Sequence, residues 1–148
     1  MVIKLPLDFK EFLRLLNSKE VRYLLIGGYA VGYHGYPRAT NDLDIWIAVD
    51  PENAEKITSA MEEFGFRQPD LSEHVFLKRD SVIRMGVAPI RIEILTSISG
   101  IEFNDSYKKN IKAVIDGIPV KIISLKDLKI NKLASGRHKD LDDLENLP

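Results

Sequence analysis

The sequence contains no cysteine and no apolar run long enough to cross a bilayer. Without cysteine the chain forms no disulfide, no zinc–thiolate site and no thiol nucleophile, and it suits a reducing compartment. A membrane-spanning helix needs about 20 successive apolar residues, and the N-terminus lacks the apolar core and cleavage site of a signal peptide. We therefore expect a cytoplasmic protein with no membrane partner.

The chain also has no large excess of positive or negative charge, since its formal net charge is −1. This near-neutral charge argues against a strong general nucleic-acid binder. The charges are nevertheless unevenly distributed. Residues 40–80 hold ten Asp or Glu against four Lys or Arg, whereas residues 101–139 hold four against nine. This polarity either sets an acidic metal-binding side against a phosphate-attracting basic side, or reflects ordinary solvated helix faces.

The 148 residues, 45% of them hydrophobic and 29% charged, predict a single globular domain spanning residues 1–148. Helices are expected at residues 8–18 (with Asp8 as N-cap), 29–34, 51–64, 103–114, 125–135 and 140–147. Strands are expected at residues 21–26, 43–49, 75–78, 82–85, 90–95 and 118–123. The third and fourth strands should form a hairpin, and Pro119 marks the last as an edge strand or a strand start. The pattern predicts an α/β (α+β) fold in which helices flank a mixed β-sheet.

Two acidic residues, Asp42 and Asp44, open the apolar run that ends at Val49. On an extended strand these side chains share one face, roughly 6.6 Å apart at about 3.3 Å per residue. Carboxylates that close repel each other, so one pKa should rise unless a cation keeps both ionised. Hard divalent cations such as Mg²⁺ prefer these oxygen ligands and keep positions for water and substrate phosphates. The pair therefore predicts a Mg²⁺ site.

The segment before this pair offers groups that bind phosphate. Gly27 and Gly28 end the preceding apolar run, where the backbone turns sharply or approaches a ligand. A helix that starts there presents N–H groups to an anion. Arg38 and Thr40 lie just upstream of Asp42, within reach of phosphate oxygens. A plain strand-to-helix turn is the alternative for an isolated glycine pair, but the two carboxylates that follow favour the phosphate site.

A third acid, Glu93, lies in the strand expected at residues 90–95, where it alternates with isoleucines. Buried in so apolar a strand, a carboxylate needs a cation or hydrogen-bond partners. The alternative is an edge-strand glutamate that faces water. The chain's three histidines show no metal-ligand spacing, and we interpret each as structural or incidental (His34, His74 and His138).

Together these motifs resemble the nucleotidyltransferase superfamily, which has the polymerase β-like fold. Residues 27–47, GGYAVGYHGYPRATNDLDIWI, are similar to the minimal and AbiEii-like branches found in prokaryotic toxin–antitoxin and abortive-infection systems. Residues 91–103, RIEILTSISGIEF, resemble the third-acid strand and the loop after it, and residues 128–144 resemble the closing motif of the same branches. The resemblance covers nearly the whole chain.

The resemblance also implies residue roles. Asp42 and Asp44 match the metal-binding carboxylates, and Glu93 matches the third acid, which joins the metal site and deprotonates or positions the attacking hydroxyl. Glu93 stands where Asp is commoner, and its extra methylene moves the carboxylate by about 1.5 Å. The two glycines match the turn that holds the triphosphate. In the closing motif, three cations are candidates for phosphate contacts, unless they only stabilise helix C-termini: Lys132, Arg137 and Lys139.

The resemblance therefore implies an enzyme with two Mg²⁺ ions, about 3.5–4 Å apart, that moves a nucleoside monophosphate from an NTP to an acceptor hydroxyl and releases pyrophosphate. The acceptor is expected to be RNA or protein, and a small helical protein encoded nearby is the expected partner in a toxin–antitoxin system. One alternative is a non-catalytic module of the same fold that binds a toxin-like protein. Another is an unrelated α/β domain whose two aspartates merely lie at an exposed strand end.

Overall fold

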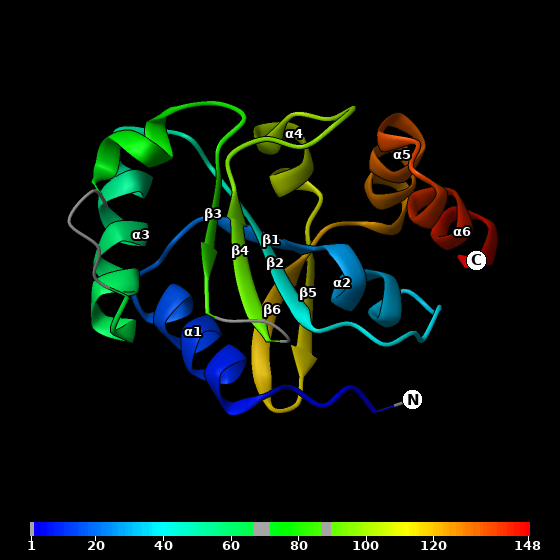
Figure 1. The fold of residues 1–148 in the computed structure, drawn as a ribbon, viewed down its shortest axis with the longest axis horizontal. Coiled ribbons are helices and arrows are strands. Elements are labelled where there is room, and N and C mark those ends of the chain that lie inside the picture. The colour runs from blue at the N-terminus through cyan, green and yellow to red at the C-terminus, as the bar shows by residue number, and fades with distance from the viewer. Residues whose placement is uncertain (1, 67–71, 87–89) are drawn as a thin grey trace.

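A six-stranded mixed sheet with the strand order β3-β4-β2-β1-β6-β5 forms the centre of the computed structural model, which describes residues 2–66, 72–86 and 90–148 (Figure 1). Strands β2 and β4 run parallel, as do β1 and β6, and the other neighbours are antiparallel. The strands are β1 (Tyr23–Ile26), β2 (Asp42–Ile47), β3 (Val82–Met85), β4 (Arg91–Leu95), β5 (Ile111–Ile115) and β6 (Ile118–Ile122). The helices are α1 (Leu7–Ser18), α2 (Gly27–Tyr33), α3 (Pro51–Phe64), α4 (Phe103–Lys108), α5 (Leu125–Ser135) and α6 (His138–Asn146), with a 3₁₀ helix, η1, at Glu73–Leu77. The predicted α/β fold is confirmed.

The two faces of β2 carry different side chains and pack against different parts of the protein. Its odd-numbered residues from Leu43 to Ile47 are fully buried, as the two-residue period of a strand requires. On the opposite face, Trp46 packs edge-to-face on Phe103 of α4, with ring centroids 5.1 Å apart. Figure 1 shows α1 and α3 at one side of the sheet and α5 and α6 at the other. Asp42 and Asp44 share the face of Trp46.

Local capping explains why two predicted helices form where expected. The side chain of Asp50 accepts a hydrogen bond from the backbone N–H of Asn53, and α3 ends at Gly65, whose φ is 105°. Ser124 caps α5 in the same way, and Gly136, with φ 66°, ends it. Within the described residues, no helix is long and apolar enough to cross a membrane.

The N-terminal and central predictions need two corrections. Helix α1 begins at Leu7 after Pro6, so Asp8 lies in the first turn and is not the N-cap. Residues 75–78 form no strand; most of them lie in η1, where only Phe76 is buried. One buried side chain needs no strand face, and β3 pairs with β4 instead of with this segment.

The predicted helix at residues 103–114 is also wrong in its second half, because α4 ends at Lys108 and β5 follows. Asp116 and Gly117 join β5 to β6, and their φ values of 49° and 81° are those of a tight hairpin turn that Asp-Gly favours. Strand β6 lies between β1 and β5 and is not an edge strand, but Pro119 stands near its start. The pairing with β1 is restricted to Leu25 and Ile122, so Pro119 interrupts no ladder there.

Candidate active site

The candidate site is a row of side chains across four neighbouring strands. Asp44 on β2 stands opposite Ile26 of β1 on one side and Glu93 of β4 on the other. Glu93 in turn stands opposite Arg84 of β3. Neighbouring strands lie about 4.8 Å apart, so this register places the Asp44 and Glu93 side chains next to each other, and the charge of Glu93 helps to raise the pKa of Asp44. Two of the three predicted acids are thus neighbours on adjacent strands.

Two glycines allow the backbone after β1 to approach this row. Gly27 has a φ of 69°, and a Cβ added to it would lie 2.1 Å from Oδ2 of Asp44. A Cβ on Gly28 would lie 2.7 Å from Oγ1 of Thr40. A side chain at Gly27 would displace the predicted metal ligand Asp44, and a side chain at Gly28 would displace Thr40, so close packing requires glycine at both positions.

The electrostatics of Asp44 differ from the simple pairwise repulsion expected from the sequence. Its pKa is raised from 3.8 to about 7, first by burial, then by the charge of Glu93 and then by the charge of Asp42. Lys139 opposes this rise. The neighbouring aspartate is therefore a smaller cause than the register partner on β4. Asp44 carries its negative charge at a free-energy cost that a bound cation would offset.

Two arginines that the sequence reasoning missed contact the outer acids. Nε of Arg84 lies 3.1 Å from Oε1 of Glu93, and Nε of Arg91 lies 3.4 Å from Oδ1 of Asp42. Arg91 precedes Glu93 by two residues, so its place on the same face was visible in the strand period. Arg84 had no such signal, because its position depends on the pairing of β3 with β4.

The closing motif forms a buried ion network. Nζ of Lys132 lies 3.2 Å from Asp140 and 2.9 Å from Asp143. Arg38 donates two hydrogen bonds, of 2.7 and 2.8 Å, to Asp143. Burial alone would raise the pKa of Asp143, but the hydrogen bonds from Arg38 and Lys132 lower it. The network ties the loop before β2 to α5 and α6.

This network changes the interpretation of two predicted phosphate contacts. The side chain of Lys132 is 6% exposed, and that of Arg38 is 16% exposed. Both cations are neutralised by internal carboxylates, although Lys132 lies at the edge of the cleft described below. A nucleotide role for Arg38 and Lys132 stays a prediction, and the structure gives both a task in holding the fold. Thr40 likewise contacts Gly28 and the backbone of Asp42.

Arg137 and Lys139 are the predicted cations that interact electrostatically with Asp44. Arg137 precedes α6, pairs with Asp140 at 2.7 Å, and keeps a side chain that is 73% exposed. Its pKa is raised, chiefly by the hydrogen bond to Asp140 and in smaller part by the charge of Asp44. The positive charge of Lys139 lowers the pKa of Asp44. Both cations are therefore electrostatically coupled to the carboxylate row.

A cleft of about 420 Å³ joins these parts. Its floor includes Asp44 and Glu93, Arg84 lines one wall, and Arg137 lies on the wall formed by α5 and α6. Gly27 also contributes to it. The cleft thus combines two adjacent carboxylates with cations on separate elements, an arrangement suited to a metal-bound phosphate.

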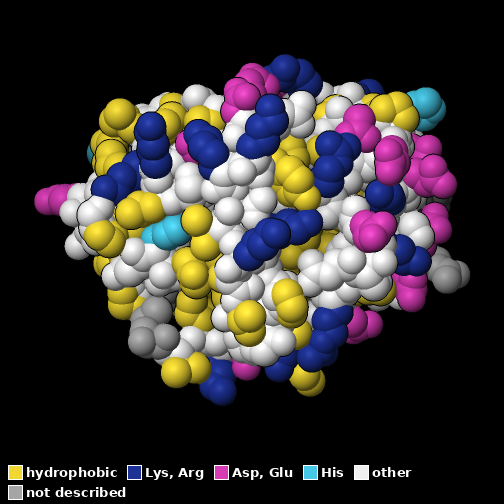
Figure 2. All heavy atoms as spheres, turned by 180° about the vertical axis from the view of Figure 1, so that it is seen from behind, with side chains coloured by type: hydrophobic (Ala, Val, Ile, Leu, Met, Phe, Trp, Pro, Cys, Tyr) yellow, Lys and Arg dark blue, Asp and Glu magenta, His cyan; other side chains and the backbone are white. Residues whose placement is uncertain are grey.

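Part of the acidic excess in residues 40–80 lies on a solvated helix and not at the predicted metal site. The acids of α3 are exposed (Glu52, Glu55, Glu62 and Glu63). Figure 2 shows Lys and Arg side chains over the centre of the rear face, with Asp and Glu gathered at the edge where α3 lies. Four of the ten acids in residues 40–80 thus belong to an ordinary solvated helix face, and three belong to β2 or to the cap of α3 (Asp42, Asp44 and Asp50).

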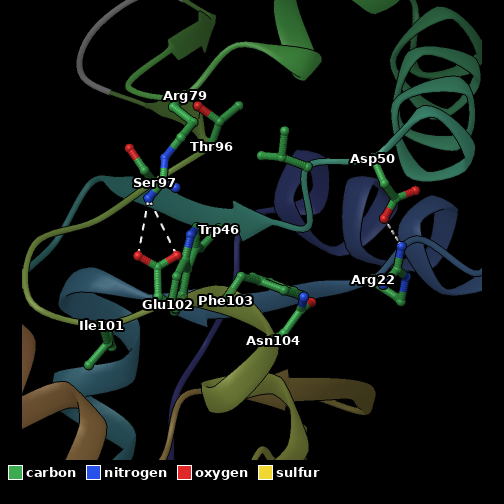
Figure 3. Close-up of a pocket in the computed structure, with 11 residues that line it drawn as sticks. Arg22, Trp46, Asp50, Arg79, Thr96, Ser97, Ile101, Glu102, Phe103 and Asn104 are labelled. Carbon is green, nitrogen blue, oxygen red and sulfur yellow. Dashed lines mark hydrogen bonds and ion pairs between the residues drawn. The ribbon is translucent and has the colours of Figure 1, made fainter.

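A second cavity, of about 320 Å³, holds none of the predicted site residues. Figure 3 shows Trp46 and Phe103 between two ion pairs, one of Arg22 with Asp50 and one in which Arg79 lies 3.2 Å from Glu102. Each cation here is already paired with an acid. This cavity therefore presents less unpaired charge than the cleft at Asp44.

The mixed sheet and the carboxylate row define a protein of the nucleotidyltransferase fold. The chain belongs to the family described as nucleotidyltransferase of unknown function (DUF6036), whose family model matches residues 5–147. No curated protein matches the chain. The superfamily expected from the sequence is thus confirmed, whereas the AbiEii-like branch stays a prediction.

Two solved structures share the fold. One is a protein of Thermotoga maritima described as a candidate nucleotidyltransferase, with 20% identity, a TM-score of 0.63, and coverage of 93% of this chain and 88% of that one. The other is ANT(2″)-Ia, solved in complex with adenylyl-2″-tobramycin, with 13% identity, a TM-score of 0.60, and coverage of 93% and 83%. At these identities the likeness concerns the fold alone.

Proposed function

We propose that the protein is a Mg²⁺-dependent nucleotidyltransferase that moves a nucleoside monophosphate from an NTP to an acceptor hydroxyl. The observation that carries the proposal is the placement of Asp44 and Glu93 side by side on paired strands, in a cleft that Arg137 also lines. Two acids held together at a cost in free energy, with cations nearby, suit a reaction on a metal-bound polyphosphate. The nucleotidylated product bound to ANT(2″)-Ia agrees with this reaction class for the fold.

The donor set fits Mg²⁺ that arrives with its nucleotide. Within the described ranges, no three His, Cys, Asp or Glu side chains are arranged to hold one metal ion by themselves. Mg²⁺ commonly takes one or two carboxylates and completes its shell with water and substrate phosphates. Asp44 lies between Asp42 on its own strand and Glu93 on β4, so it can supply one or two of these carboxylate ligands together with a neighbour. Bound there, two ions would neutralise charge on the attacking and leaving oxygens.

The residues of the chain have separate tasks in the transfer. The acceptor oxygen forms a bond to the α-phosphorus, the bond from that phosphorus to the bridging β-oxygen breaks, and pyrophosphate leaves. Glu93 accepts the hydroxyl proton. Arg137 and Lys139 stabilise the phosphate charge from the α6 side, and the backbone at Gly27 leaves room for the nucleotide beside Asp44. Positioning and charge neutralisation supply most of the catalysis in this kind of reaction.

A second candidate function is a non-catalytic module that binds a toxin-like protein. The observation in its favour is that Arg84 and Arg91 already pair with Glu93 and Asp42. Cations of the protein thus occupy positions that metal ions need in an enzyme. Both candidates fit a paired toxin–antitoxin system with a small helical partner, and turnover distinguishes them.

The test is a transfer assay with the purified protein, Mg²⁺, each labelled NTP and total cell extract, resolved for labelled RNA and labelled protein. Asp44→Asn provides the inactive comparison, and Glu55→Gln on the exposed face of α3 provides the matched control. We expect one labelled product class with the native protein and the control, and none with Asp44→Asn. The absence of product with all four NTPs favours the binding module.

A further inference from the structure

We propose that Arg84 binds a phosphate group of the acceptor, so that the acceptor carries a phosphate beside the hydroxyl it offers. This acceptor class presupposes the proposed nucleotidyl transfer. It goes beyond that proposal because it assigns the acceptor side of the cleft, its recognition residue and the chemistry recognised.

The guanidinium of Arg84 is held at the cleft with most of its donors unused. Its only hydrogen bond among the described residues runs from Nε to Glu93, at 3.1 Å. An arginine side chain carries five N–H donors in a planar fork, and this one is 60% exposed. The pairing of β3 with β4 fixes the backbone of Arg84 opposite Glu93, and its exposed side chain lines the cleft.

The order of the strands gives the cleft two chemically distinct ends. From β1 to β3, the row runs past Asp44 and Glu93 to Arg84. The cations coupled to Asp44, Arg137 and Lys139, belong to the α6 end. In Figure 1, β3 and the α5–α6 pair lie on opposite sides of β2 and β4. Arg84 therefore lies beside Glu93 at one end of the row, and Arg137 and Lys139 lie toward the other end.

In an in-line displacement, the NTP and the acceptor occupy opposite ends of the cleft. The attacking and leaving oxygens lie on opposite sides of the α-phosphorus. The pyrophosphate, with the larger negative charge, is drawn toward the two cations at α6. The acceptor then approaches over Glu93, from the end where Arg84 is the nearest cation.

Charge balance at that end selects an anionic acceptor. Without substrate, Arg84 and Glu93 neutralise each other. When Glu93 engages the acceptor hydroxyl, Arg84 loses this partner and needs another anion in the cleft. A phosphate next to the hydroxyl supplies one with the oxygen spacing that an arginine fork binds well. A cationic acceptor would instead be repelled.

The test measures binding of phosphorylated and unphosphorylated probes with Mg²⁺ and no NTP. The probes are ribose 5-phosphate, ribose, and an RNA trinucleotide with a free 3′-hydroxyl, each measured by calorimetry. The native protein should bind the phosphorylated probes about tenfold more tightly than ribose, as expected for one partly exposed charged hydrogen-bond pair. Arg84→Gln should remove this preference and Arg84→Lys should retain part of it. Arg79→Gln, an exposed arginine at the second cavity, should leave it unchanged.

The outcomes separate this assignment from the proposed function. Tighter binding of the trinucleotide than of ribose 5-phosphate identifies a polynucleotide end as the source of the phosphate, and equal binding identifies a small phosphate ester. Equal binding of ribose and ribose 5-phosphate by the native protein, or a preference removed by Arg137→Gln and not by Arg84→Gln, overturns the assignment. NTP–Mg²⁺ binding, measured separately, should be unchanged in Arg84→Gln. Its absence in the native protein overturns the proposed function instead.

Discussion

Replacing Asp44 with asparagine should stabilise the metal-free protein, and the gain should depend on pH. Burial, with the charges of Glu93 and Asp42, raises the pKa of Asp44 from 3.8 to about 7. The folded state therefore binds this proton more tightly than the unfolded chain, and ionisation destabilises the fold as the pH rises between these values. Each pKa unit corresponds to about 1.36 kcal/mol, so the cost reaches at most roughly 4 kcal/mol above about pH 7 and is absent below about pH 4.

Urea unfolding of the native protein and of Asp44→Asn across this pH range measures the effect. The variant should match the native protein near pH 4 and exceed its free energy of unfolding by up to a few kcal/mol near pH 8. Mg²⁺ added near pH 8 should stabilise the native protein and not the variant. Glu55→Gln on α3 should show no such pH-dependent gain. A difference that does not change with pH, or a variant less stable than the native protein near pH 8, would refute the reasoning.

Three further substitutions test separate parts of the site. Glu93→Gln should lower the transfer rate and leave NTP binding largely intact in single-turnover kinetics, because the interaction matters mainly in the transition state; equal losses would make Glu93 a ground-state ligand. Gly27→Ala should abolish transfer and lower Tm, because its Cβ would meet Asp44 at 2.1 Å, and near-native activity would contradict this. Asp143→Asn should lower the free energy of unfolding by about 3–5 kcal/mol, because Arg38 and Lys132 lose a buried partner; a loss below about 1 kcal/mol in urea unfolding would argue against the network.

Features that depend on neighbouring residues in the chain could be predicted from the sequence. The helix that Asp50 caps and Gly65 ends is one example, since cap chemistry is local. The shared face of Asp42 and Asp44 is another, since it follows from the strand period alone. The Asp-Gly turn before β6 is an equally local signal, and it favours a hairpin strand at residues 111–115, where the helix predicted for residues 103–114 is wrong.

Features that depend on strand pairing or on the packing of distant elements could not be predicted in this way. Arg84 reaches Glu93 because β3 pairs with β4, and nothing in the local pattern of either strand states that register. Lys132 lies between two acids of α6, and this internal pairing is not visible in the local sequence around the lysine. The sequence identifies the charged residues, but the tertiary fold decides which of them are neutralised internally.

The binding of NTP together with Mg²⁺ tests the central claim most directly, because Asp42 and Asp44 repel a bare triphosphate and attract one through the metal. A ligand at about 100 times its Kd stabilises the folded state by about 2.7 kcal/mol. Each kcal/mol shifts the Tm of a domain of this size by roughly 2–4 °C. Thermal melts should therefore rise by several degrees with NTP plus Mg²⁺, more than with either alone, and the rise should vanish in the Asp42→Asn, Asp44→Asn double variant. A rise of equal size in EDTA, or one that persists in the double variant, would contradict the account.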